Sequence, residues 1–152
     1  MAHTALQVAD KFIRVGIEKD QFFTQMQLLK LVYIAHGWML ALADKPLITN
    51  RIEAWQYGPV IPELYHELKL NGAKPIKRPI LADAASFSSN EEKVIQFTLK
   101  NYGKFSAFQL SDITHAINTP WSDSYGKKEY IPDSLIACHY KELYKKYSKK
   151  SN

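Results

Sequence analysis

The sequence predicts a mainly α-helical fold: a compact single domain of about six helices around one central hydrophobic helix, with at most a small two-stranded β ribbon. The first observation is a repeated helix-start signal, the capping box, in which Ser or Thr is followed three residues later by Gln or Glu. The second is the stretch after Thr24, which is apolar on nearly every side, as in a helix packed on several faces. The third is the composition: 152 residues that are 46% hydrophobic fit one domain with a sizeable core.

Four capping boxes fix the helix starts in chain order. They are Thr4 with Gln7, Thr24 with Gln27, Ser89 with Glu92, and Ser106 with Gln109. Hydrophobic spacing and the Gly, Asn and Pro stops then predict six helices. These run over Ala5–Glu18, Gln25–Ala43 (with Leu31 and Leu42 facing inward), Pro62 to Asn71-Gly72, Asn90–Tyr102, Ala107–Ile117, and from about Asp133 onward. The domain is expected to occupy residues 1–147, and 148–152 to form a basic, disordered tail.

The segment 53–65, which we call the corner, is the most informative part of the chain. Loose alternation over Ile52–Tyr57 predicts a short strand, with Pro79–Leu81 as a candidate second strand. Gly58 can take a positive φ, while Pro59 fixes φ near −65° and donates no amide. Pro62 suits the first turn of the following helix. The corner is therefore expected to be a rigid recognition or packing element.

Aromatic side chains give the corner its chemistry. Strand alternation would place Trp55 and Tyr57 on the same side of the strand. Tyr65 follows in the first turn of the helix that begins at Pro62. Tyrosine and tryptophan anchor many protein interfaces but also fill cores, and both interpretations stay open for Trp55 and Tyr57. Trp121, after Pro120, is expected in the core, as a plug in the loop after the fifth helix.

The remaining motifs exclude most catalytic chemistry. No histidine pairs with another His or Cys at metal-binding spacing, and His66-Glu67 lacks the second histidine of an H-E-x-x-H site. Glu63 and Glu67 share a helical face, which suits a solvated first turn. Cys138 is expected to be a buried small residue within the last helix. Hence we expect no catalytic, cofactor or metal site and no enzymatic activity.

The cysteine count, hydropathy and charge of the chain limit the cellular compartment and the binding partners to be expected. One cysteine, no evident signal peptide and no apolar run long enough to span a bilayer favour a reduced, cytoplasmic setting without membrane contact. The net charge of +5 is concentrated in the loop 69–79 and in the stretch from His139 onward. Such clusters can hold a phosphate backbone weakly and in a salt-dependent way, so nucleic-acid binding remains an alternative. The oligomeric state is not indicated.

Several motifs resemble the Panacea domain, which SocA-like antitoxins and phage-associated GepA-like proteins carry. They are Gln27–Trp38, Lys45-Pro46-Leu47, Ile52–Pro62, and a second, weaker motif in Leu110–His115 with Pro120-Trp121. The resemblance runs from about Leu6 to the helix after Pro132. It implies an antitoxin-type binding protein, encoded beside a toxin gene and without a known catalytic centre.

The function implied by this resemblance is neutralisation of a cognate protein toxin by direct binding. Binding could occlude the toxin's active site or present the toxin to a protease. The alternative is a nucleic-acid-binding regulator of its own operon or a phage-associated regulatory protein. Residues expected at the partner interface are Trp55, Tyr57, Gly58, Pro59, Pro62, Tyr65 and His115.

Overall fold

The fold is mainly α-helical, as predicted. The computed structural model describes residues 2–150. Within this range the elements are α1 (Ala5–Glu18), α2 (Gln25–Ala43), β1 (Glu53–Trp55), β2 (Gly58–Val60), α3 (Pro62–Leu68), a 3₁₀ turn η1 (Lys69–Asn71), α4 (Ser89–Tyr102), α5 (Ala107–Thr114), α6 (Pro120–Ser124) and α7 (Asp133–Lys150).

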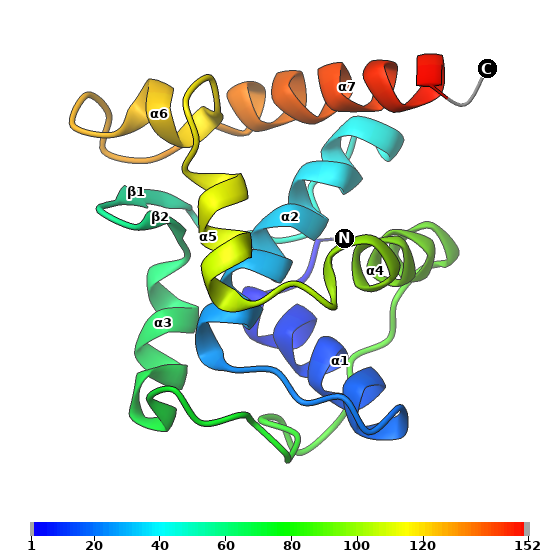
Figure 1. The fold of residues 1–152 in the computed structure, drawn as a ribbon. Coiled ribbons are helices and arrows are strands. Elements are labelled where there is room, and N and C mark those ends of the chain that lie inside the picture. Colours follow the sequence, from blue (N-terminus) through cyan, green and yellow to red (C-terminus); the bar gives the residue numbers. More distant parts are fainter. Residues whose placement is uncertain (1, 151–152) are drawn as a thin grey trace.

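Helix α2 is the hub of the fold. Helices α1, α3, α4, α5 and α7 all pack against it, and Figure 1 shows it passing through the middle of the molecule. Every residue from Leu28 to Leu40 is buried. By length and composition alone α2 could cross a membrane, but 72% of its most apolar window is buried inside the protein. That burial is typical of the core helix of a folded domain.

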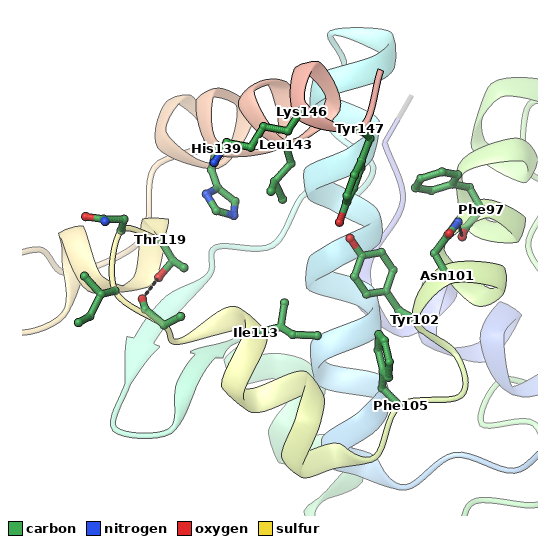
Figure 2. Close-up of a pocket in the computed structure, with 13 residues that line it drawn as sticks. Phe97, Asn101, Tyr102, Phe105, Ile113, Thr119, His139, Leu143, Lys146 and Tyr147 are labelled. Carbon is green, nitrogen blue, oxygen red and sulfur yellow. Dashed lines mark hydrogen bonds between the residues drawn. The ribbon is translucent and has the colours of Figure 1, made fainter. Parts of the chain in front are cut away.

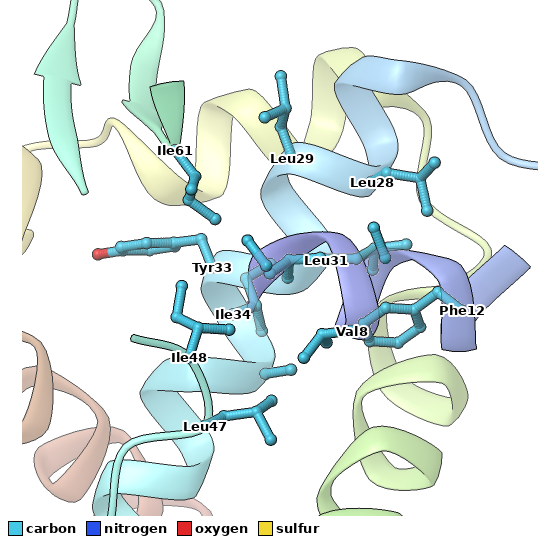
Figure 3. Close-up of a cluster of buried hydrophobic side chains, with 14 of the residues drawn as sticks. Val8, Phe12, Leu28, Leu29, Leu31, Tyr33, Ile34, Leu47, Ile48 and Ile61 are labelled. Carbon is cyan, nitrogen blue, oxygen red and sulfur yellow. The ribbon is translucent and has the colours of Figure 1, made fainter. Parts of the chain in front are cut away.

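The core forms where α1 and the loop after α2 meet the hub. Figure 3 shows Val8 and Phe12 of α1 beside Leu31 of α2, with Leu47 and Ile48 closing the cluster. Full burial of each such side chain contributes about 1.5–3 kcal/mol to folding. This cluster fixes the position of α2, and therefore of the helices that pack against it.

A buried histidine ties three segments together. His36 Nδ1 accepts the backbone amides of Leu47 (3.2 Å) and Ile48 (3.3 Å), so the ring proton is on Nε2. Nε2 then donates to Asp133 Oδ1 at 2.9 Å. The ring thereby joins the hub, the loop after it and the start of α7.

Three of the four predicted capping boxes are confirmed, and the one for α4 is wrong by one residue. Ser88 and Glu91 close that box, in place of Ser89 and Glu92. The sequence doubles both residue types here, so either register fits the pattern. Tertiary contacts decide between them, because the buried Glu91 carboxylate also lies 3.2 Å from His3 Nδ1.

The strand pairing also differs from expectation. Strand β1 pairs with β2 in an antiparallel hairpin, with Trp55 opposite Gly58. The candidate second strand at Pro79–Leu81 is not a strand. The backbone amides of its last two residues donate to Oδ1 of the buried Asp10 at 2.9 and 3.1 Å, so they take no part in a ladder.

The chain after α5 holds an unpredicted helix. Helix α5 ends at Thr114 instead of Ile117, and His115 is its C-cap. The predicted loop then contains α6, whose capping box is Thr119 with Ser122. Because Ser closes this box in place of Glu or Gln, the usual capping-box pattern does not reveal it.

Two predicted core positions are exposed. Leu42 is 44% exposed, because the buried part of α2 ends at Leu40. Cys138 is exposed as well. It lies two residues from the buried Ile136, and two residues turn a helix by about 200°.

Helix α7 continues to Lys150, so the basic tail expected at 148–152 begins inside a helix; residues 151 and 152 lie outside the described range.

Candidate protein-binding corner

Glycine is required at the tip of the corner for two reasons. Gly58 has φ +120, a backbone conformation that side chains rarely adopt and that glycine permits. A Cβ at Gly58 would also lie 2.9 Å from Lys30 Nζ and 3.5 Å from His115 Cβ. Pro59 follows in β2 and is buried, and Pro62 occupies the first turn of α3, as predicted.

Side chains from three helices hold the backbone of the hairpin. Each donates a hydrogen bond to a different hairpin carbonyl, and the three acceptors alternate along the chain. The bonds run from Trp121 Nε1 of α6 to the Trp55 oxygen (2.6 Å), from Ser111 Oγ of α5 to the Tyr57 oxygen (2.8 Å), and from Lys30 Nζ of α2 to the Pro59 oxygen (2.8 Å). A single bond of this kind contributes about 0.5–1.5 kcal/mol net, and one from a charged donor contributes more. Together they fix the hairpin from three directions.

Lys30 is the unusual member of this set. Its side chain is fully buried, and burial lowers its pKa from 10.5 to about 8. It is therefore mostly protonated at neutral pH, with the Pro59 oxygen as a hydrogen-bond acceptor. A buried cation is costly unless it is well paired, so we infer that Lys30 is present to position the hairpin. Sequence reasoning missed it, although a lysine in a helix that is apolar all round was the available signal.

The structure separates the two aromatics that were expected on one side. Strand β1 ends at Trp55, and Tyr57 lies in the following turn with 67% of its surface exposed. Trp55 is half-buried: its ring meets Tyr65 edge-on at 5.2 Å and its Nε1 donates to Glu53 at 2.9 Å. Tyr57 is thus available to a partner, while Trp55 also contributes to the fold.

The other predicted interface residue, His115, supports the corner from α5. It is half-buried, its Nδ1 lies against the Ser111 carbonyl, and its ring meets Trp121 edge-on at 5.4 Å. Trp121 is half-buried and stacks on Tyr125 at 4.8 Å, so it joins the corner to α6 in place of plugging a loop in the core. These contacts connect the two motifs that lie far apart in the sequence.

Phe108 is a second exposed aromatic, and it lies on the helix whose Ser111 holds the hairpin. It is 81% exposed and precedes Ser111 by three residues on α5, so the two share a helix face. Ser111 itself binds the Tyr57 carbonyl. Sequence reasoning missed Phe108 because an isolated phenylalanine in an amphipathic helix is normally assigned to the core.

The acidic and histidine side chains of the described residues form no metal-binding group. Within residues 2–150 no three His, Cys, Asp or Glu side chains are placed to hold a metal ion. Glu63, His66 and Glu67 of α3 are all exposed. The chemistry that the corner offers is recognition by aromatic surface on a fixed backbone.

Comparison with known proteins identifies the family. The family model of the antitoxin SocA-like, Panacea domain matches residues 28–122. This chain belongs to that family. It is also 32% identical over 127 residues to antitoxin SocA of Caulobacter vibrioides, in an alignment that covers 77% of this chain and 68% of that protein. No solved structure matches.

The matched segment contains the whole hydrogen-bonded corner. All three donors and all three carbonyl acceptors of the hairpin lie between residues 28 and 122. The Panacea domain of this chain is thus the part that builds and holds the corner. Family membership and the SocA relative support an antitoxin-like role for the protein.

Proposed function

We propose that this protein neutralises a cognate protein toxin by direct binding, and that the corner makes the decisive contact. The observation that carries the proposal is the exposed Tyr57 on a backbone held by three helices. An aromatic anchor that is already fixed loses little conformational entropy on binding, so more of its buried area becomes affinity. Phe108, one helical turn before the hairpin-binding Ser111, offers further exposed apolar surface.

Co-expression with the product of the adjacent reading frame tests this function. The toxin alone should arrest growth, and the wild-type chain should restore it. We expect the double variant Tyr57→Ala/Phe108→Ala to lose about 30-fold or more in affinity for the purified toxin, since interface anchors contribute about 2 kcal/mol or more. Its melting temperature should stay close to that of the wild type, because both side chains are largely exposed.

Tyr144→Ala is the matched control. Tyr144 is 51% exposed on α7 and lies outside the corner, so its truncation removes a similar side chain without touching the hairpin. Retained toxin affinity in the double variant would remove the corner from the interface. If the neighbouring gene product is harmless when expressed alone, it is not a toxin, and the proposed function is wrong.

The fate of the toxin separates two modes of neutralisation. If the chain occludes the toxin, the toxin's half-life in the cell should be unchanged and its activity inhibited in a purified mixture. If the chain delivers the toxin to a protease, the half-life should fall when the chain is co-expressed. A pulse-chase experiment with the wild type and the Tyr57→Ala/Phe108→Ala variant measures this directly.

Nucleic-acid binding is the second candidate, and the exposed cations of one loop favour it. Lys69, Lys74, Lys77 and Arg78 are all exposed. A mobility-shift assay on the upstream DNA at two salt concentrations tests it. Binding that disappears at physiological salt would reduce it to non-specific attraction.

A further inference from the structure

A second surface lies on the other side of α5 from the corner. Helices α4, α5 and α7 each pack on the hub but leave a groove of about 790 Å³ between them. Figure 2 shows side chains from all three helices facing this space, with Tyr102 and Tyr147 approaching each other at one end. Apolar and aromatic side chains make up most of the lining: Phe97, Tyr102, Phe105, Ile113, Leu143 and Tyr147.

The groove is wide open along the edge formed by α5 and the turn after it. Ile113 is 41% exposed and Ile117 is 86% exposed, although both line the groove. At the other edge Tyr147 is 48% exposed. Exposed branched aliphatic side chains around an apolar concavity are typical of a surface that another protein covers.

The floor of the groove is anchored to the hub. Trp38 Nε1 donates to the Tyr102 hydroxyl at 3.1 Å, and burial raises the pKa of Tyr102 to about 12. The Trp38 ring also stacks on Tyr147, with centroids 6.1 Å apart. The concave shape therefore depends on the core, so an occupant meets a preformed surface.

Charge selects among the possible occupants. Among the described residues no Asp or Glu lines the groove, whereas Lys146 does. Burial, followed by the charge of Lys146, lowers the pKa of His139 against the opposing charge of Asp123, which favours the neutral ring. Of the other lysines from His139 onward, Lys141 is ion-paired with Asp44 and Lys145 lies 3.5 Å from Glu142, whereas Lys149 is exposed. A second copy of this +5 chain would bring the same cations, whereas a partner with carboxylates would be attracted.

We propose that this groove docks an amphipathic helix of the toxin, with its apolar face in the groove and a carboxylate against Lys146. The proposal rests on the proposed function, because the toxin is the partner. Helix α5 connects the two surfaces. Its Ser111 contacts the hairpin, and its Ile113 lines the groove, so one partner can straddle α5 and cover both.

Designed peptides test the groove without the toxin. One probe is a helical peptide with leucines at i, i+4 and i+7 and glutamates on both flanks. Its matched partner carries lysines in place of the glutamates. We expect the glutamate peptide to bind the wild type, about tenfold or more tighter than the lysine peptide, as measured by fluorescence anisotropy. Ile117→Asp and Lys146→Glu should each weaken it by about tenfold or more.

Two controls make the result specific. Leu70→Asp changes a side chain that is 93% exposed on η1 and should leave peptide affinity unchanged. Tyr57→Ala should also leave it unchanged, because Tyr57 does not line the groove. No binding by the glutamate peptide, equal affinity for both peptides, or full affinity in Ile117→Asp would overturn the proposal. So would a wild-type dimer that Ile117→Asp dissociates, or a nucleic acid whose binding depends on Ile117.

The toxin complex then separates this inference from the proposed function. Ile117→Asp and Tyr57→Ala should each weaken toxin binding if both surfaces are used. Loss with Tyr57→Ala and none with Ile117→Asp would overturn the groove and keep the function. A wild-type chain that binds the glutamate peptide but no toxin would overturn the function while supporting the groove as a site for acidic helices.

Discussion

The hub and the corner are built from similar residues but held by different forces. The hub helix α2 is rich in leucine and aromatic side chains, and solvent is excluded from Leu28 to Leu40. The corner also carries tryptophan, tyrosine and proline, but three hydrogen bonds to its carbonyls fix its shape and one of its aromatics is left in solvent. The hub thus supplies stability through burial, and the corner supplies a backbone of defined shape with an exposed tyrosine.

Lys30 belongs to both regions. It lies within the buried run of α2, and its ammonium group donates to the Pro59 carbonyl of the corner. A leucine there would complete the hub but leave the Pro59 oxygen without this donor. Burying a cation costs more than burying a leucine, so the core is less stable at the position that holds the hairpin.

The largest effect should come from removing a hub side chain. Leu31→Ala empties a fully buried site and should lower the free energy of unfolding by about 2–5 kcal/mol. Leu42→Ala on the same helix is the control, because Leu42 is 44% exposed, and should cost less than about 1 kcal/mol. Urea unfolding of both variants measures the difference. Equal losses would mean that burial does not distinguish the two ends of α2.

The next effect concerns the tip of the corner. Gly58→Ala should cost about 1–3 kcal/mol, because an alanine at φ +120 is strained and its Cβ would lie 2.9 Å from Lys30 Nζ. Gly72→Ala is the matched control: it has φ +56 and open space around the added carbon, so it should cost less. Toxin affinity should fall only in Gly58→Ala. Identical stabilities for the two variants would show that neither the φ of +120 nor the close approach to Lys30 adds a cost at Gly58.

Lys30 should reveal itself in the pH dependence of stability. The pKa of Lys30 is about 8 in the folded protein and 10.5 when the side chain is in water. Well below pH 8, Lys30 is therefore protonated in both the folded and the unfolded chain. Between these values the unfolded chain binds more protons, and stability rises with pH. The wild type should therefore gain about 2 kcal/mol relative to Lys30→Met between pH 7 and 9.5. Comparing the two proteins cancels the titration of the tyrosines, and a constant difference across this range would show that Lys30 is not desolvated.

The sequence predicted the hub far better than the corner, and the reason is physical. The bounds of α1 and α2 are confirmed because capping boxes and helical periodicity are local signals. Family resemblance indicated the corner residues. However, the donors Lys30, Ser111 and Trp121 reach the hairpin from 29 to 66 residues away, and no local pattern encodes such pairs. The exposure of Leu42 and Phe108 likewise depends on which helices cover them.

The smallest effect should be the most specific one. Ser111→Ala removes a single hydrogen bond to the Tyr57 carbonyl, which is worth about 0.5–1.5 kcal/mol of stability. Toxin affinity should fall as well, because that bond positions Tyr57, which we propose as a toxin contact. Ser122→Ala is a useful comparison, since Ser122 bonds only within the α6 cap and should change stability by a similar amount. If both variants bind the toxin equally well, the hydrogen bonds of the corner serve folding alone and recognition lies elsewhere.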